Sequence, residues 1–261
     1  MLWLTVLTGC KAVDPLPEDL DGAVHWLWGA MDAGAAAEVH AGVVALDGAL
    51  GGDALVAATD GSISRLTAEQ VAPLGITDRD PADAAALFIA NRIDCGLDDV
   101  VDIFSAPNQD ELYPGVYAQQ ERTYDGDRDA LLAGDVDDLR WSLTYQTSIL
   151  GSRYTGGTEA YLRRVRPDPA SGAPFDDAYL VRFHAPEPAV FEEGAGKSFT
   201  QDYQFEVYWA REDGATLHAY AMWREANWGA GFTSEEEGVQ RLLLNGMKDW
   251  DDDTARICAE R

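Results

Sequence analysis

Two runs of alternating residues, 203–211 and 216–224, are separated by a short segment that contains Asp213-Gly214. An Asp-Gly pair between two such runs is a strong signal for a β-hairpin. Side chains alternate between the two faces of a strand, so the first run has one apolar and one mixed face. The apolar face holds Phe205, Val207 and Trp209, and the other face holds Gln204, Glu206 and Tyr208.

Further runs of period two precede this hairpin. They occur at 141–145, where Trp141, Leu143 and Tyr145 alternate with polar residues, and again at 159–166 and 178–183. Alternation combined with aromatic residues indicates half-buried strands. From about residue 140 the chain is therefore predicted to form an antiparallel meander.

A long helix is expected to close the chain. Ser234-Glu-Glu-Glu237 has the capping-box pattern of a helix start. The residues after it place apolar side chains at helical spacing on one stripe. The members of this stripe are Val239, Leu242, Leu243, Met247, Trp250, Thr254 and Cys258. The sheet and this helix are assigned to residues 110–261.

Residues 20–109 have helical signals instead. One apolar stripe at helical spacing consists of Val39, Val43, Leu46 and Leu50. Thr67-Ala-Glu-Gln70 has a capping-box pattern. Asp80-Pro81 offers an N-cap acceptor followed by proline, which predicts a helix over Pro81–Asp94. The expected fold class is therefore α+β: a helical N-terminal part, then an antiparallel meander sheet closed by a long C-terminal helix, in one domain or two.

A meander followed by one long helix resembles the helix-grip arrangement of the START-like lipid-transfer and polyketide-cyclase families. The resemblance covers residues 110–261 and lies in the order of the elements. In those families the helix packs across a curved sheet and encloses an apolar cavity. The resemblance implies such a cavity here; the alternative is that the many Trp and Tyr residues of the strands form a solid core.

Charge restricts the partners of the chain. Its 46 acidic and 19 basic residues give a formal net charge of -27. Such a charge repels nucleic-acid phosphates and anionic lipid head groups, so neither is an expected partner. Hydrophobic residues make up 46% of the chain, which suits a packed core rather than disorder. After residue 9 no apolar run is long enough to span a membrane, so membrane attachment would need a lipid.

The first ten residues are a short apolar run that ends in Leu-Thr-Gly-Cys10. These four residues resemble the lipobox of bacterial lipoproteins, in which a peptidase cleaves before a lipidated cysteine. The resemblance implies a signal peptide at 1–9, a lipid on Cys10 and a Pro-rich tether at 10–19. Together with Lys11, it also implies an outer-membrane lipoprotein of the cell envelope that faces the periplasm or the exterior. The alternative is a buried strand over Leu2–Leu7.

Cys95 and Cys258 remain once Cys10 is assigned to the lipid. An even pair of cysteines in an oxidising compartment can form a disulfide, and this one would close a long loop, for which the chain-entropy model predicts strong stabilisation. Two buried free thiols are the alternative. The disulfide is the preferred interpretation.

Catalytic motifs are scarce. The four histidines are His25, His40, His184 and His218, and none has a second histidine at metal-ligand spacing. His184 and His218 lie on predicted strands that could be neighbours. The sequence has no Gly-x-Ser-x-Gly elbow and no G-x-x-x-x-G-K-[ST] phosphate loop. Neither a nucleophile nor a cofactor is therefore expected.

Acidic clusters are the remaining candidate sites. Asp125, Asp127 and Asp129 carry carboxylates at alternate positions, as the start of a calcium loop does. They lack the glycine and the bidentate glutamate of an EF-hand, so the hypothesis is a looser Ca²⁺ site, with a solvated loop as the alternative. The clusters at 98–102 and 249–253 are assigned to solvated surface.

Three functional classes follow. The main hypothesis is a non-enzymatic, lipid-anchored cell-envelope protein that binds a protein partner or helps to organise the envelope. The alternative is a carrier of an apolar ligand in a helix-grip cavity. The third is an enzyme with an acidic site, for example one that hydrolyses glycans with two carboxylates.

Overall fold

The computed structural model describes residues 15–51, 59–61, 63–192 and 196–261. The predicted signal peptide, the predicted lipidation of Cys10 and the first residues of the predicted tether fall on residues 1–14, outside the described residues. Within the described part of the chain, no helix has both the length and the apolar character needed to cross a bilayer.

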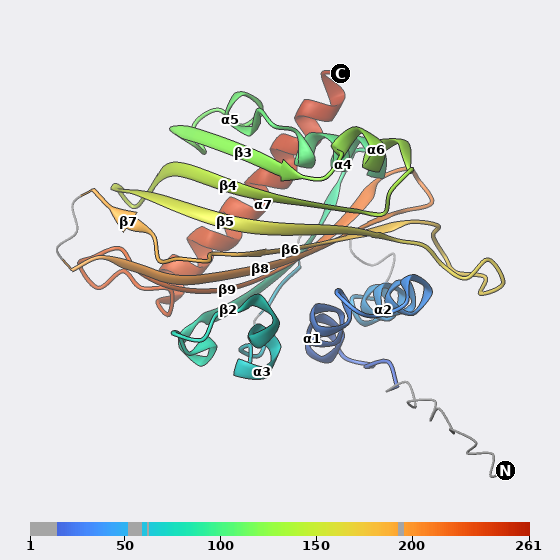
Figure 1. Ribbon diagram of the computed structural model, residues 1–261, viewed down its shortest axis with the longest axis horizontal. Coiled ribbons are helices and arrows are strands. Elements are labelled where there is room, and N and C mark those ends of the chain that lie inside the picture. The colour runs from blue at the N-terminus through green and yellow to red at the C-terminus, as the bar shows by residue number, and fades with distance from the viewer. Residues whose placement is uncertain (1–14, 52–58, 62, 193–195) are drawn as a thin grey trace, which may run out of the picture.

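An antiparallel sheet is the centre of the fold (Figure 1). In the described residues it has nine strands, of which eight lie in the order β1-β2-β9-β8-β6-β5-β4-β3 while β7 pairs with β5. Along this order the bounds are β1 Thr59–Gly61, β2 Ala85–Ile93, β9 Thr216–Asn227, β8 Ser198–Ala210, β6 Ala178–His184, β5 Ser152–Val165, β4 Asp138–Ile149 and β3 Gln119–Asp125, with β7 at Val190–Phe191. Apart from β7, strands β3 to β9 are neighbours in chain order, which confirms the predicted meander.

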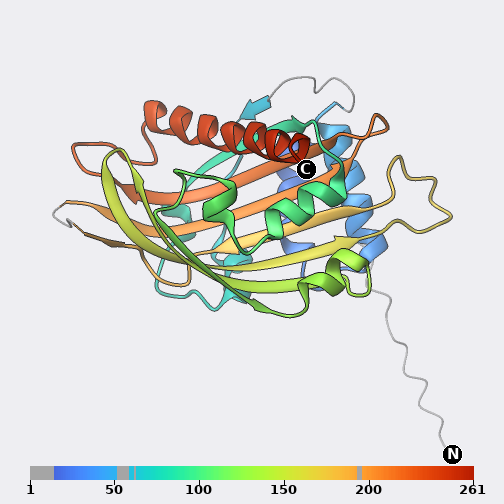
Figure 2. The same ribbon diagram turned by 90° about the horizontal axis from the view of Figure 1, so that it is seen from above.

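Helices cover both faces of this sheet. The α-helices are α1 Leu20–Ala30, α2 Ala36–Ala49, α3 Ala68–Val71, α4 Leu97–Ser105, α5 Gln109–Leu112, α6 Arg128–Ala133 and α7 Glu237–Ala259. Figure 2 shows α7 running across one face, with α1 and α2 on the other side of the sheet. A long C-terminal helix laid over an antiparallel sheet is the helix-grip arrangement, so the predicted α+β class is confirmed.

The two faces of β8 are those predicted from alternation. Phe205, Val207 and Trp209 lie in the core under α1 and α2, where the indole of Trp28 contacts the ring of Phe205 at 6.0 Å between centroids. α1 and α2 approach so closely at Gly42 that a Cβ there would lie 2.4 Å from the ring of Trp26. Only glycine fits at this position. The mixed face of β8 points to the side covered by α7.

The β8–β9 hairpin is also confirmed. Ala210 pairs with Thr216, and the turn between them contains Asp213 and Gly214. Gly214 has φ of +84°, a left-handed conformation that favours glycine. The capping box of Thr67 and Gln70 is present at the start of α3.

The predicted helix over Pro81–Asp94 is wrong. Asp80 does cap a turn, but this is a 3-10 turn at Pro81–Asp83, and β2 follows it. Leu87 packs towards the α7 side and Phe88 towards α1 and α2, so β2 is buried on both faces. A strand buried on both faces has no period-two pattern, and its apolar run is indistinguishable from a buried helix by periodicity.

The predicted capping box at Ser234 is also wrong. α7 begins at Glu237, and its N-cap, Glu236, makes no side-chain cap hydrogen bond. The hydroxyl of Ser234 instead accepts a hydrogen bond from the backbone N–H of Ala226 at the end of β9. The side chain is thus used to end the preceding strand.

A disulfide joins Cys95 and Cys258, with 6.0 Å between their Cα atoms. It links the segment between β2 and α4 to the last turn of α7. The predicted pairing is therefore present in the structure, and it fixes the C-terminal end of α7 to the sheet side.

We expect the double substitution Cys95→Ser and Cys258→Ser to lower the free energy of unfolding by about 2–5 kcal/mol, because the bond restricts the unfolded chain over a long loop. Urea unfolding of the oxidised protein and of the variant measures this difference. Cys10→Ser is the control and should leave it unchanged. Equal stability of the native chain with and without reductant would contradict the prediction.

Candidate functional site

A cavity of about 510 Å³ lies between α7 and the sheet face that it covers. Its walls come from α4, the α5–β3 segment, strands β3 to β6, β8 and β9, and one side of α7. Much of the lining is apolar, including Phe104, Leu143, Phe183, Met222 and Met247. A cavity of this size, with apolar walls and a few polar groups, is typical of small-molecule sites.

The cavity opens to solvent beside three exposed apolar side chains. Val116, Leu150 and Leu242 line it and are 37%, 44% and 45% exposed. Leu242 had been expected in the core, and it lies at this mouth instead. Leu150 forms the β4–β5 turn with Gly151 and has φ of +51°, a conformation that costs a non-glycine residue about 1–2 kcal/mol. The turn thus presents an apolar side chain where glycine or asparagine would be unstrained.

Tyrosines make up another part of the wall. Tyr117, Tyr145, Tyr154 and Tyr220 all line the cavity. Burial raises the pKa of Tyr117 and Tyr154 to about 12, so both phenols stay neutral at physiological pH. The ring of Tyr145 meets those of Tyr117 and Tyr154 edge-on, with 5.8 and 6.2 Å between centroids.

One buried ion pair at the cavity is fully compensated. The guanidinium of Arg224 donates to both carboxylate oxygens of Asp202 at 2.9 and 3.0 Å. Gln204 also donates to Asp202 at 2.6 Å, and the hydroxyl of Tyr220 donates to Gln204. Burial opposes the charge of Arg224, but Asp202 outweighs it and raises the pKa of the guanidinium. This group is therefore satisfied without a ligand.

A second buried group connects α7 to the sheet. His218 on β9 and Asp251 on α7 are 2% and 1% exposed, and Nδ1 of the imidazole lies 2.8 Å from Oδ1 of the carboxylate. Asn91 on β2 donates to the other oxygen of Asp251 at 3.1 Å. Nε2 of His218 lies 3.4 Å from Oε2 of Glu206, without hydrogen-bond alignment, and the ring stacks on Tyr208 at 4.1 Å.

This environment keeps His218 charged. Burial by itself lowers the pKa of the imidazole, but the carboxylates of Asp251 and Glu206 outweigh it and raise the pKa to about 9. The imidazolium therefore persists at neutral pH and cannot act as a general base there. Its role in the described structure is to hold α7 on the sheet.

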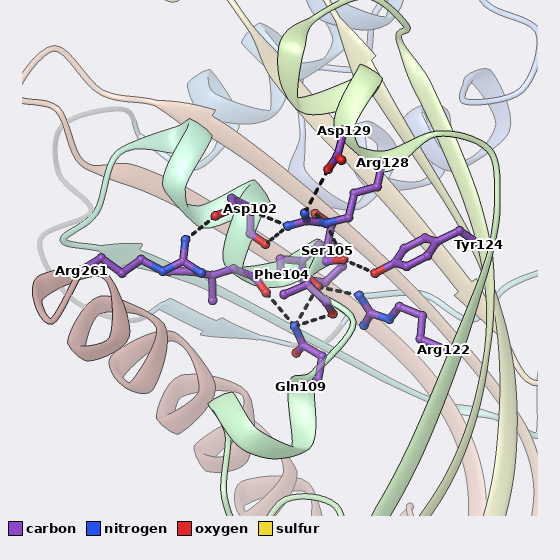
Figure 3. Close-up of polar contacts among 11 residues, drawn as sticks. Asp102, Phe104, Ser105, Gln109, Arg122, Tyr124, Arg128, Asp129 and Arg261 are labelled. Atoms are coloured by element: carbon purple, nitrogen blue, oxygen red, sulfur yellow. Dashed lines mark hydrogen bonds and ion pairs between the residues drawn. The ribbon is translucent and has the colours of Figure 1, made fainter.

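Phe104, in the C-terminal turn of α4, lines the cavity. Figure 3 shows the polar contacts around this turn. Its last carbonyl groups have no partner within the helix, and side-chain donors from elsewhere satisfy them. Gln109 donates to the carbonyl of Phe104 at 3.1 Å and Arg122 donates to the same oxygen at 2.9 Å. Arg128 donates to the carbonyls of Asp102 and Ser105 at 2.7 and 3.0 Å. Arg122 and Arg128 also place two positive charges at the negative end of the dipole of α4, which stabilises the helix.

Three polar atoms of the cavity lining are buried without a hydrogen-bond partner in the described structure. They are Nε of Arg122, Oγ1 of Thr158 and Nε2 of His218. Buried polar groups in native proteins are nearly always paired, and leaving one unpaired costs about 1–3 kcal/mol. A ligand or ordered water in the cavity would supply partners for these atoms.

Sequence reasoning missed two of these groups. Asp251 had been placed in a solvated acidic cluster, which is wrong: it stands four residues after Met247 and three before Thr254, on the buried stripe of α7. Glu206 had been placed on the mixed face of β8, but nothing in the sequence showed that this face lines a cavity. The helical stripe was the signal that could have found Asp251.

The structure does not bring the other candidate residues together. His184 on β6 and His218 on β9 are separated by β8, so they are not neighbours. Asp127 caps α6 by accepting from the N–H of Ala130, and Asp129 lies 3.8 Å from Arg128 in an ion pair. Among the residues described, the carboxylates of Asp125, Asp127 and Asp129 do not gather within 4.8 Å of one another.

A Ser-His-Asp cluster near α1 lacks the geometry of a nucleophile. The hydroxyl of Ser64 lies 2.8 Å from Nε2 of His25, and Asp21 accepts from that hydroxyl. Gln70 uses its amide oxygen in the capping box with Thr67, so its NH₂ group faces Nδ1 of His25 at 2.8 Å. Nδ1 is then the acceptor and Nε2 carries the proton, so His25 cannot take a proton from Ser64.

Comparisons with known proteins find similarity only in structure. No family model and no curated protein matches the chain. A START superfamily protein from Mycobacterium smegmatis matches at 11% identity and a TM-score of 0.42, covering 67% of this chain and 97% of its own. Human STARD10 matches at 8% and 0.41, covering 76% and 82%. The Zhui aromatase/cyclase from Streptomyces sp. R1128 matches at 11% and 0.39, covering 68% and 93%. With values this low, the likeness carries no argument about what this chain binds.

The buried histidine makes a prediction about stability. Because the pKa of His218 is raised from 6.5 to about 9, its contribution is complete below pH 6.5 and is lost as the pH rises through 9. We expect the free energy of unfolding to fall by on the order of 3 kcal/mol across that window. Urea unfolding at intervals from pH 6.5 to 9.5 measures it.

The control is the pair of substitutions His218→Gln and Asp251→Asn, which removes both charges and keeps polar side chains. This variant should lose the decline between pH 6.5 and 9. An unchanged decline in the variant would assign it to another group.

Proposed function

We propose that this chain binds one small apolar or amphipathic molecule in the cavity under α7 and carries it shielded from water. The observation that supports the proposal most directly is the cavity of about 510 Å³ with apolar walls and unpartnered polar atoms. Apolar walls favour a hydrophobic ligand, and the polar atoms would orient it.

The arrangement of charged groups favours binding over catalysis. In the described part of the cavity, the Arg224–Asp202 and His218–Asp251 ion pairs hold their charges in fixed contacts. His218 is not a base at neutral pH, and Ser64 is not activated by His25. The proposal therefore takes up the carrier hypothesis in preference to envelope organisation or an acidic enzyme.

A neutral fluorescent probe tests this function. N-phenyl-1-naphthylamine should bind the purified chain with a large fluorescence increase and a stoichiometry of one, because the cavity removes it from water. Gly246 lies on α7 between Leu242 and Trp250, which also line the cavity, so a side chain there would stand over the mouth. We expect Gly246→Trp to weaken binding by about tenfold, since each 1.4 kcal/mol of lost binding energy is tenfold in affinity.

Gly238→Trp is the matched control. It lies on the same helix, a Cβ there meets nothing within 4 Å, as at Gly246, and it does not line the cavity. It should leave probe binding unchanged. If the native chain fails to bind the probe, or if both variants bind as the native chain does, the cavity is not a ligand site.

We also propose that the protein is exported and held in the cell envelope by a lipid on Cys10. The lipobox-like residues before Cys10 and the Pro-rich segment after it support this, and a disulfide between Cys95 and Cys258 suits an oxidising compartment. Cells that express the chain should incorporate an alkyne palmitate analogue into it, and Cys10→Ala should abolish the label. Equal labelling of Cys95→Ala/Cys258→Ala confirms that the anchor is separate from the disulfide, while labelling of Cys10→Ala would contradict the anchor.

A further inference from the structure

Arg122 is a partly buried cation at the cavity, and its Nε is buried without a hydrogen-bond partner. One of its terminal nitrogens donates to the carbonyl of Phe104, and the guanidinium lies 5.0 Å from the ring centroid of Trp141. In the described structure it forms no ion pair, whereas Arg224 in the same cavity has Asp202. Burial accordingly lowers the pKa of Arg122. Removing part of a cation from water without a counter-ion costs free energy, and a bound anion would reduce that cost.

Thr158 offers a second donor on the same wall. Arg122 on β3 pairs with Leu143 on β4, and Leu143 pairs with Thr158 on β5. All three side chains therefore point to the same side of the sheet, and all three line the cavity. Thr158 is 6% exposed, and its hydroxyl has no hydrogen-bond partner in the described part of the chain. Nε of Arg122 likewise has no hydrogen-bond partner there.

The surroundings of His218 are unsuited to an anion. Nε2 of His218 is unpartnered there, but Glu206 lies 3.4 Å from it. Glu206 and Asp251 together carry one more negative charge than the imidazolium of His218 compensates. An anionic group would be repelled beside Glu206 and attracted beside Arg122.

We propose that the ligand is a single-chain amphipathic anion, an inference that rests on the proposed function. Its carboxylate or phosphate oxygens accept hydrogen bonds from Nε of Arg122 and Oγ1 of Thr158. Its apolar chain lies along the cavity past Leu143 and Phe183. Charge-assisted hydrogen bonds of this kind are stronger than those between neutral groups, so the anionic headgroup carries selectivity while the chain carries most of the affinity.

Displacement of the neutral probe N-phenyl-1-naphthylamine from the full chain tests the inference. The competitors are hexadecanoic acid, hexadecyl phosphate and hexadecanol, which share one chain length and differ in the headgroup. We expect at least one of the two anions to displace the probe about tenfold more tightly than the alcohol. The order of acid and phosphate identifies which anionic group the site takes.

Two substitutions locate the headgroup. Arg122→Met keeps the length of the side chain and removes its charge, and Gln109 still donates to the carbonyl of Phe104, so the turn of α4 keeps a donor. Thr158→Val removes only the hydroxyl. Both should reduce the preference for the anion over the alcohol, Arg122→Met to near unity and Thr158→Val in part. Arg140→Met, on the neighbouring strand with its guanidinium over Tyr161 on the opposite face, is the control and should keep the preference.

The outcomes separate the two proposals. If the probe and all three competitors fail to bind, the ligand-binding function itself is wrong. If hexadecanol binds as tightly as both anions, the function stands and the anionic headgroup is wrong. If the anions are preferred and Arg122→Met keeps that preference while its thermal unfolding shows a folded protein, the headgroup lies elsewhere and the assignment to Arg122 is overturned.

Discussion

The ion pair between Asp251 and His218 is the contact on which the position of α7 depends. It joins a helix to the middle of a sheet through two side chains that are almost completely removed from water. Removing one member would leave a buried charge without compensation, which typically costs about 3–5 kcal/mol. With the disulfide at Cys258 it fixes the C-terminal part of α7. Closer to the start of α7, Leu243 and Met247 line the cavity, and in the described structure the helix is not held there by a buried ion pair of this kind.

The interior and the surface of this protein differ in charge. The surface is strongly acidic, yet the cavity wall contains the cations Arg122, Arg224 and His218. A net charge of -27 does not attract an anion from solution, so electrostatic steering contributes nothing to its association. Selectivity for an anion would arise only after the ligand has left water, where a single unpaired guanidinium acts at low dielectric. An acidic surface is therefore compatible with selectivity for an anion at Arg122.

The parts of the fold that sequence reasoning predicted are those with a strong local signal. Alternation around Asp213-Gly214 gave the β8–β9 hairpin and its two faces, and helical spacing gave most of the buried stripe of α7. β2 was missed because burial on both faces removes the alternation that marks a strand, and its pairing with β9 is settled far away in the sequence. The site was missed for a related reason. The groups around His218 and Asp251 come from β8, β2 and α7. No spacing in the sequence predicts that Glu206, Asn91 and Asp251 meet there.

The position of β2 in the sheet also determines the order in which the fold can be completed. β2 is made early in the chain, and it lies between β1 and β9, so its main partner is more than a hundred residues away. Until residues 216–227 have left the ribosome, the edge of this apolar strand that pairs with β9 has no partner. Cys95 likewise waits for Cys258, 163 residues later. β9 and α7, which are synthesised last, thus provide the partners of β2 and Cys95. Such distant pairings are intrinsically slow to form. During synthesis this unpaired apolar edge is therefore a place at which the chain can aggregate.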